Sequence, residues 1–480
     1  MKKLYFLLGA LPLLYSCSEI EKLPDITPLL PEVTTRLAGD EKYDVLGFGY
    51  DVTGEYLHPM SVKNPVLDIE KYEKDNKGRL IYGTSSFGFD RMYYGYSSSD
   101  YTKDVTTDTK ATLNMDYGSE KDTAFFSGNI SDNSYLKTEY SYSDKYSFAS
   151  LDIVRNRKYI RFNDEVSNLS QYLSTEFKED LKRLTPNRIV ERYGTHVLTD
   201  FIIGGRYKLM FRSVITNTKD TSTKRQIVHS GFKITLGKIG LGYNLDQDET
   251  VYESLAKENR SKELYVLFYG GNGTNLKYDL EKGIPTSVDT QSWENSVSLE
   301  NSCLTAITWK ETYPIYAFIS DPVKKAEIQQ AVHNYIKNAK LKVTRLKLLY
   351  SYEYDNGAKH LVTTNDGIAE SFPSWKLICH EGYILEEQIL GTVPLYEYYN
   401  DKKMDFYITT DPNYNISNSS YKKEQIMGYV YNQASESTVP FYEYYHAKHV
   451  DHLTSYNPYI TQNFSGWTRL GITGYIYPND

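Results

Sequence analysis

The chain has 480 residues, 40% of them hydrophobic and 24% charged, which is ordinary for a globular protein but too long for one compact core, so two or three domains are expected. The net charge of −8 argues against nucleic acid as a partner and against simple electrostatic attraction to anionic lipid. Tyrosine is the outlier, with 47 residues, and it favours strands with half-buried or exposed faces.

The N-terminus has the features of a secretory signal. Two lysines precede an apolar run over 4–14 that is too short to span a membrane. Leu14-Tyr15-Ser16-Cys17 resembles a bacterial lipobox, which predicts removal of 1–16 and lipidation of Cys17. The alternative is an ordinary secretory signal in which this cysteine is incidental. Residues 17–40 lack periodicity and are expected to form a tether.

A first folded domain is predicted over 41–342. It opens with an aromatic, glycine-rich strand pattern at 43–52. Two consecutive helices are expected later, because Ser174 and Thr185-Pro186 have the residue types that begin helices. The second of these helices ends before Gly194. Strands at 201–214 and 263–269, a tryptophan-containing segment at 293–297 and a helix from Pro322 to about Lys337 complete this region.

A short motif follows the second helix. A paired glycine inside a strand costs backbone entropy, so it indicates a bulge, a bend or a close backbone approach. The motif resembles the signature of the membrane attack complex/perforin (MACPF) superfamily, an aromatic-Gly-Thr-His core followed by Gly-Gly. The resemblance implies an α+β fold in which a bent, twisted central antiparallel sheet is flanked by helical clusters. The residues concerned are Tyr193, Gly194, Thr195, His196, Gly204 and Gly205.

Two roles remain open for these six residues. The glycine pair permits the bend and its straightening, with the tyrosine and the histidine stabilising the corner, or all six are simply a capped helix and a bulge. Neither role involves catalysis.

The same resemblance implies two segments that are helical in the soluble form and refold into membrane-spanning β-hairpins. By position they are about 108–140 and about 216–262. Apolar and polar residues alternate in both, as in a strand with one lipid-facing and one wet face, although such alternation also occurs in any half-buried strand. The candidate insertion residues are Leu113, Met115 and Tyr117 in the first segment, and Phe232, Ile234, Leu236, Ile239, Leu241 and Tyr243 in the second.

A single hairpin cannot insert alone, because its strand edges would leave backbone groups unsatisfied in hydrocarbon. Many subunits must combine their hairpins into one closed barrel. We therefore expect a homo-oligomeric ring as the membrane-inserted form.

Residues 343–480 contain a triple repeat with a spacing of 46 residues, seen in Tyr350-Ser-Tyr-Glu-Tyr-Asp, Tyr396-Glu-Tyr-Tyr-Asn-Asp and Tyr442-Glu-Tyr-Tyr-His-Ala. Three equal β-rich units must pack on one another, which favours a threefold, β-trefoil-like all-β domain. This domain is a candidate receptor-binding domain, although its aromatic residues need no ligand if they form its core. Candidate contacts are Tyr396, Asp405, Tyr442, Asp451 and His452.

Enzymatic chemistry has no positive support in the sequence. The run His446, His449 and His452 has a spacing that could bind metal, but a solvated turn explains it better, and no metal or other cofactor is expected. The glycines of 237–242 lack the spacing of a phosphate loop. Two distant cysteines, Cys303 and Cys379, make no disulfide framework.

The sequence therefore predicts a secreted, lipid-anchored, non-enzymatic pore-forming protein. It resembles the surface MACPF lipoproteins of gut Bacteroidales, which implies a place on the bacterial outer membrane surface, or release from it, and toxicity to related bacteria. The partners implied are a target membrane and a surface glycan or outer-membrane protein receptor. The alternative is a non-lytic adhesion or interaction protein on the same scaffold.

Overall fold

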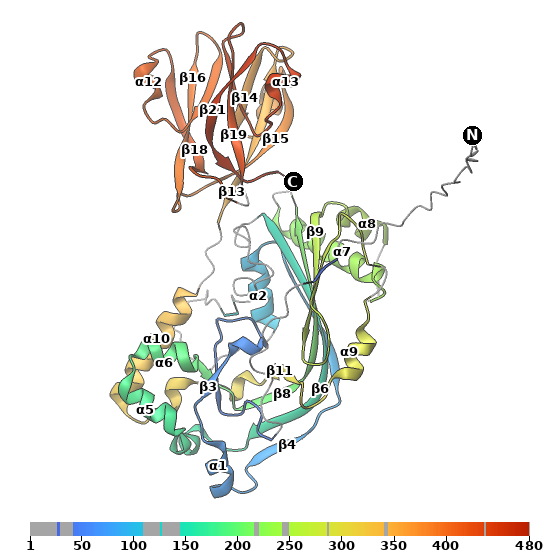
Figure 1. The fold of residues 1–480 in the computed structure, drawn as a ribbon, viewed down its shortest axis with the longest axis vertical. Coiled ribbons are helices and arrows are strands. Elements are labelled where there is room, and N and C mark those ends of the chain that lie inside the picture. The colour runs from blue at the N-terminus through green and yellow to red at the C-terminus, as the bar shows by residue number, and fades with distance from the viewer. Residues whose placement is uncertain are drawn as a thin grey trace, which may run out of the picture.

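The computed structural model describes residues 26–28, 42–108, 125–126, 145–215, 220–241, 249–285, 288–339, 344–435 and 438–479. Two parts are visible in Figure 1: a lower part built on a long bent sheet and an upper all-β part. The predicted signal peptide, Cys17 and four candidate insertion residues lie outside the described residues: Leu113, Met115, Tyr117 and Tyr243.

A long antiparallel sheet forms the centre of the first part and bends along its length (Figure 1). Its order in the described residues is β1-β10-β9-β8-β6-β4, with β5 also paired to β6 and β11 to β8. The two longest strands are neighbours, β6 (Tyr146–Phe162) and β8 (Asp200–Val214). The others are β1 (Ile26–Pro28), β4 (Leu80–Thr84), β5 (Gly88–Gly95), β9 (Arg260–Tyr269), β10 (Leu276–Asp279) and β11 (Cys303–Ile307).

A smaller sheet of order β12-β7-β2-β3 and a group of helices fill the inside of the bend. The expected helices are confirmed: Ser174 Oγ accepts from the Phe177 amide at 3.1 Å at the start of α5, and α6 begins at Pro186. The strands are β2 (Phe48–Tyr50), β3 (Val62–Pro65), β7 (His196–Val197) and β12 (Tyr313–Pro314). The helices are α1 (Ile69–Asp75), α4 (Val166–Leu169), α5 (Thr175–Arg183), α6 (Pro186–Tyr193) and α10 (Pro322–Asn338), with 3-10 turns at Pro59–Ser61, Ser170–Tyr172, Trp309–Glu311 and Ile315–Phe318.

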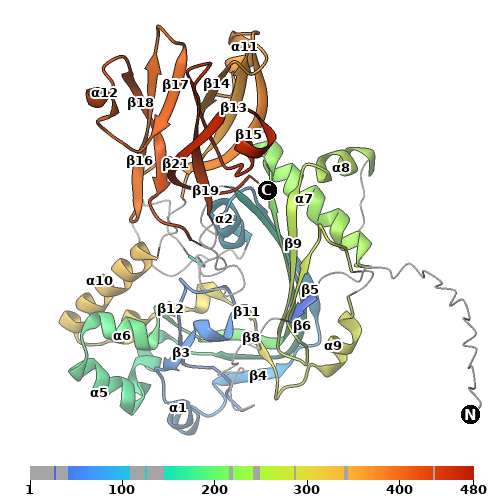
Figure 2. The ribbon, with the colours of Figure 1, turned by 45° about the horizontal axis from the view of Figure 1, so that its top comes forward.

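The central sheet is buried on both faces, so it separates two cores. On β8, Tyr207, Leu209 and Phe211 face one core, while Arg206 and Lys208 face the other side. Figures 1 and 2 show α7 and α9 outside the bent sheet and α2 inside it. These helices are α2 (Ser98–Asp108), α7 (Thr221–Lys238), α8 (Glu249–Ala256) and α9 (Thr290–Ser296).

The all-β part confirms the threefold repeat. Each repeat supplies three antiparallel strands and one short helix in the described residues, and all three repeats pack on one core. The trefoil arrangement in particular stays a prediction. The first repeat has β13 (Leu346–Tyr354), β14 (Lys359–Thr363), α11 (Ile368–Ser371) and β15 (Trp375–Leu385); the second has β16 (Thr392–Asn400), β17 (Asp405–Thr409), α12 (Tyr414–Ser417) and β18 (Lys422–Tyr431); the third has β19 (Val439–His446), β20 (Asp451–Ser455), α13 (Ile460–Asn463) and β21 (Trp467–Ile476).

Many tyrosines are more deeply buried than the composition indicated. Tyr352, Tyr398 and Tyr444 occupy the same position of the three repeats and are almost fully buried. Burial is tolerated because each hydroxyl donates to a backbone carbonyl, for example from Tyr398 to Asp411 O at 2.9 Å.

The two parts touch at the base of the repeat domain. Lys145 Nζ, at the start of β6, donates to Pro478 O at 3.1 Å and lies 5.2 Å from the Tyr383 ring centroid. Across the ranges that the structure describes, no helix combines the length and the apolar character needed to cross a membrane.

Candidate functional site at the bend of the central sheet

Buried contacts fix the end of α6. Tyr193 is fully buried, its hydroxyl donates to Asp180 Oδ2 at 2.9 Å, and its ring meets Phe177 edge-on. Gly194 follows with a φ of +74°, and a Cβ at this position would lie 2.6 Å from Tyr50 O. Both the left-handed backbone and the close approach therefore require glycine here.

Thr195 and His196 attach this corner to β2. The Thr195 amide and hydroxyl both donate to Tyr50 O, at 2.9 and 3.0 Å, and the hydroxyl accepts from the Val52 amide at 3.1 Å. His196 Nδ1 lies 3.0 Å from the same hydroxyl, and we assign it as the donor because the hydroxyl proton is already used. Burial lowers the pKa of His196 to about 3, so the ring is neutral at pH 7. These residues form a packed corner.

The glycine pair is explained by close approach on two sides. A Cβ on Gly204 would lie 2.0 Å from Arg155 O on β6, where the β6–β8 register shifts by one residue. A Cβ on Gly205 would lie 2.5 Å from Val297 Cγ2 and 2.8 Å from Trp293 Cζ2. The first glycine thus accommodates the bulge, and the second lets α9 lie directly on the sheet.

Helix α9 is fastened to the bend by further bonds. Trp293 Nε1 donates to Gly270 O at the end of β9, at 2.9 Å, and Arg157 Nε on β6 donates to Val297 O at 3.0 Å. Because α9 packs on Gly205 and bonds to both neighbouring strands, straightening the sheet at this point requires α9 to move. The sequence indicated a tryptophan-containing segment at 293–297, but no local pattern predicted that this segment packs on the glycine pair.

The opposite face of the bend carries buried charges. Lys208 Nζ donates to Glu55 Oε1 at 2.8 Å, and Arg206 Nη1 lies 3.4 Å from Asp152 Oδ2. All four side chains are at most 3% exposed. Burial alone would raise the pKa of Glu55, but the Lys208 ammonium, together with His58 and the Arg206 guanidinium, outweighs burial and lowers this pKa to about 2. Arg206 and Lys208 are spaced by two in a strand, so the sequence indicates that they share one face of the sheet. It does not identify their acidic partners.

The described part of the second candidate insertion segment is largely helical, in α7 and α8, as the resemblance implies for the soluble form. Phe232, Leu236 and Ile239 are buried against the outer face of the sheet, whereas Ile234 and Leu241 are half-buried. Residues four apart share one helix face, so the alternating pattern that fits a strand also gives α7 an apolar face. Their insertion into a membrane stays a prediction.

An ion-pair bridge that sequence reasoning missed joins the second segment to α2, the helix that leads into the first segment. Arg225 on α7 pairs with Asp100 on α2, with Nη1 to Oδ2 at 2.6 Å, and also with Asp104. Its guanidinium lies 4.5 Å from the ring centroid of Tyr94, on the strand between the two helices. The partners are 121 to 125 residues apart in sequence, so no local pattern identifies them.

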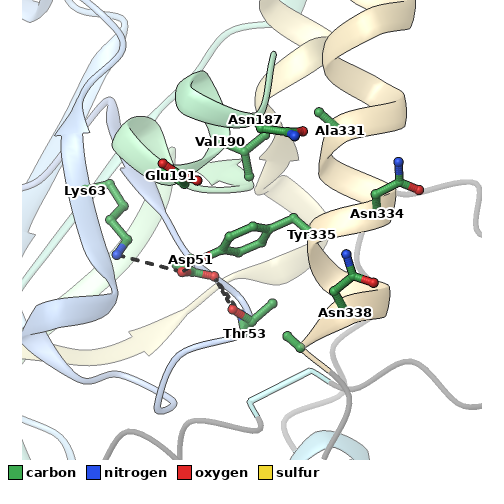
Figure 3. A pocket seen from close by; sticks show the side chains of 11 residues that line it. Asp51, Thr53, Lys63, Asn187, Val190, Glu191, Ala331, Asn334, Tyr335 and Asn338 are labelled. Atoms are coloured by element: carbon green, nitrogen blue, oxygen red, sulfur yellow. Dashed lines mark hydrogen bonds and ion pairs between the residues drawn. The ribbon is translucent and has the colours of Figure 1, made fainter. Parts of the chain in front are cut away.

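A polar cavity of about 680 Å³ lies beside the signature helix (Figure 3). Its floor is Asp51, which accepts from the Tyr335 hydroxyl at 2.8 Å and from the Thr53 amide and hydroxyl, with Lys63 at 3.8 Å. The carboxylate is thus satisfied by the chain itself and ties α10 to the end of β2. The other lining residues are Asn187, Val190, Glu191, Ala331, Asn334, Asn338 and Ala339.

In the repeat domain, two candidate contacts are buried pairs between neighbouring repeats. Asp405 accepts from the His452 amide and Nδ1, both at 2.8 Å, and Asp451 accepts from the His360 amide at 3.0 Å and Nδ1 at 2.7 Å. Both aspartates have no exposed surface. We call these two arrangements the His–Asp clamps; they join the second repeat to the third, and the third to the first.

The other candidates of this domain lie nearer the surface. Tyr396 and Tyr442 are half-buried beneath the cations of Lys423 and Arg469, at 4.4 and 5.0 Å from the ring centroids. The rings of His446 and His449 lie 4.4 Å apart, while His452 belongs to a clamp. Among the described residues, no three His, Cys, Asp or Glu side chains are arranged to hold a metal ion.

A bent antiparallel sheet with an aromatic-Gly-Thr-His corner, a glycine pair and flanking helical clusters defines a MACPF-type fold. The MAC/Perforin domain family matches residues 38–344, and the chain belongs to this family. Its scaffold is therefore of the pore-forming type. A domain family of unknown function, DUF5648, matches residues 347–477.

The chain is also similar to solved structures at low sequence identity. A MAC/Perforin-domain protein of Bacteroides thetaiotaomicron is 16% identical with a TM-score of 0.48, over 79% of this chain and 72% of the other. GNIP1Aa from Chromobacterium piscinae is 12% identical with a TM-score of 0.46, over 92% of this chain and 83% of the other. No curated protein matches the chain.

Proposed function

We propose that this protein is a secreted, lipid-anchored pore-forming protein of bacteria that oligomerises and inserts two β-hairpins per subunit into a target membrane. Its targets are related bacteria, and its repeat domain finds them through a surface glycan or an outer-membrane protein. The protein acts by changing its conformation and catalyses no reaction. The protein resides on the outer membrane surface or is released from it.

The connectivity of the sheet is the observation that carries this proposal. Strands β5 and β6 are antiparallel neighbours, and the chain between them, from Tyr96 to Lys145, contains the first segment. Strands β8 and β9 are also antiparallel neighbours, joined through Ile215–Asn259, which contains the second. Each segment is therefore already the tip of a hairpin, and refolding would prolong strand pairs that exist.

The order β5-β6-β8-β9 places all four strands side by side. One spanning strand takes ~9–11 residues, so both segments hold enough chain for two. Refolding would give each subunit four contiguous strands, and a ring of subunits would satisfy their edges.

A disulfide that holds α7 in place tests the mechanism. A Cβ built on Gly231 lies 2.7 Å from Asn259 Cγ, so cysteines at these two positions come within bonding range. In a Cys379→Ser background, we expect the oxidised Gly231→Cys/Asn259→Cys protein to release no dye from vesicles made of target-membrane lipid, and to recover when reduced.

Each single cysteine variant, under the same oxidant, is the matched control. Release by the oxidised double variant, with the disulfide verified by mass, would show that α7 does not refold. A protein that binds target cells but releases dye under no condition would be the non-lytic adhesion protein.

A further inference from the structure

The repeat domain contains a cavity of about 710 Å³ at the junction between its third and first repeats. The first repeat contributes Glu381 and His360, and the third contributes His449 and Trp467. Hydrogen-bonding and aromatic groups line it together, while neither lysine nor arginine is among its lining residues.

The pseudo-threefold symmetry shows what is unusual about this cavity. A residue of the third repeat and its counterpart in the second are 46 positions apart, so Leu453 corresponds to Tyr407 and Ile460 to Tyr414. At the junction between the second and third repeats these two tyrosines fill the corresponding space, with ring centroids 4.4 Å apart. The 3/1 junction, called the open junction below, has aliphatic side chains in place of these two phenol rings; the first repeat has them as well, as Leu361 and Ile368.

The tyrosine-filled junction also shows which chemical group belongs in the space. There the Tyr407 hydroxyl donates to the buried acid Glu443. At the open junction Ser351 holds the position of Glu443, and the buried acid is Glu381, which comes from a different position of the repeat. Glu381 is 1% exposed, and its Oε2 accepts from Ser455 Oγ at 2.8 Å and from the Tyr456 amide at 3.1 Å. Burial raises the pKa of Glu381. Among the described residues, no tyrosine hydroxyl donates to Glu381 as the Tyr407 hydroxyl donates to Glu443.

We propose that this junction binds a neutral, polyhydroxylated ligand, an uncharged oligosaccharide, whose hydroxyls take the place of the tyrosine phenols. The proposal deepens the receptor role assigned to the repeat domain above, and rests on it.

The wall residues fit this ligand class. Trp467, Tyr456 and Phe464 offer aromatic faces for the C–H face of a sugar ring, and the last two are 39% and 57% exposed. Asn356 and Asn457 can each donate and accept to hydroxyls. With acidic side chains and no lysine or arginine in the wall, sugars that carry carboxylate or phosphate are disfavoured.

The junction between the first and second repeats differs from the open one in its acid. Glu397 stands there at the position of Glu443, and its Oε2 accepts from Gln425 Nε2 at 2.6 Å. Where the open junction has Glu381 and His360, this junction has Met427 and Phe406. Glu381 is thus particular to the open junction, because the other two repeats have Met427 and Thr473 at its position, whereas the glycines of the strand bulges and the buried Tyr352, Tyr398 and Tyr444 recur in all three repeats.

The test is binding of the full-length mature protein to an array of neutral, N-acetylated and acidic oligosaccharides, followed by calorimetry with the neutral oligosaccharide that binds best. We expect neutral sugars to bind and purely acidic ones not to bind. Leu453→Tyr/Ile460→Tyr, which copies the closed junction, should abolish binding with an unchanged melting temperature.

Glu381→Gln, which keeps the shape but not the acid, should weaken binding about tenfold or more, and it serves if the double variant does not fold. Glu443→Gln at the closed junction is the control and should bind normally. Binding of acidic sugars only, binding of no sugar, or full binding by Leu453→Tyr/Ile460→Tyr and Glu381→Gln would each overturn the proposal. Because the assay contains no membrane, a protein that releases dye but binds no sugar refutes only the oligosaccharide site, and the converse result refutes only the pore.

Discussion

At the scale of single residues, the signature is a packing device. Thr195 satisfies the Tyr50 carbonyl of β2 and the Val52 amide, and His196 bonds to the Thr195 hydroxyl. Gly194 and Gly204 admit neighbouring backbone where any Cβ would collide. Gly205 differs, because the atoms that its Cβ would meet belong to side chains of α9. A substitution at Gly205 therefore tests how closely α9 packs on the bend.

We expect Gly205→Ala to destabilise the soluble protein by about 1–3 kcal/mol, because the new methyl overlaps the packed side chains of Val297 and Trp293. Gly237→Ala, at an open position of α7, should instead stabilise by up to ~1 kcal/mol. Urea unfolding measures both. Equal effects of the two variants would mean that α9 is not seated on the sheet as described.

At the scale of elements, the sequence identified what depends on local chemistry. The N-cap of α5, the start of α6 at Pro186, the stop at Gly194 and the repeat spacing depend on neighbouring residues, and all are confirmed. The contacts that shape the candidate site join distant residues, such as Arg225 with Asp100, and local pattern cannot pair them. Composition likewise did not predict the cavity at the open junction, which is found only by comparing the three junctions of the folded repeats.

The Arg225 bridge holds α7 to α2 and should restrain refolding of both segments. Arg225→Met is expected to speed dye release while costing about 1 kcal/mol or less of folding stability, because the pair is partly exposed. Lys238→Met, which removes a cation from the exposed end of the same helix, is the control. The rate of dye release is measured by stopped flow. An unchanged rate for Arg225→Met would show that the ion-pair bridge does not restrain refolding.

At the scale of the whole molecule, the proposed function assigns target choice and membrane insertion to different domains. The contact between them includes Lys145 with Pro478 and Tyr383, at the point where β6 leaves the first segment. The MAC/Perforin family match ends before the repeats begin, so the sheet and its helices belong to a unit with its own core.

Deletion of 343–480 should therefore leave the first domain folded but remove its choice of target. The truncated protein is expected to keep its cooperative unfolding transition and to lose binding to target cells, measured by flow cytometry of the labelled protein. Binding with unchanged target choice would place receptor recognition in the first domain.

The His–Asp clamps have a consequence for how the repeat domain changes over evolutionary time. They secure two of the three junctions through charged hydrogen bonds inside the domain, and the 3/1 clamp sits at one edge of the cavity without using its acid. Substitutions at Glu381, Leu453 or Ile460 can then retune the cavity while the clamps keep the three repeats assembled. Under the proposed function, a lineage in conflict with its neighbours could in this way change from one surface sugar to another while the sheet and its helices stay the same.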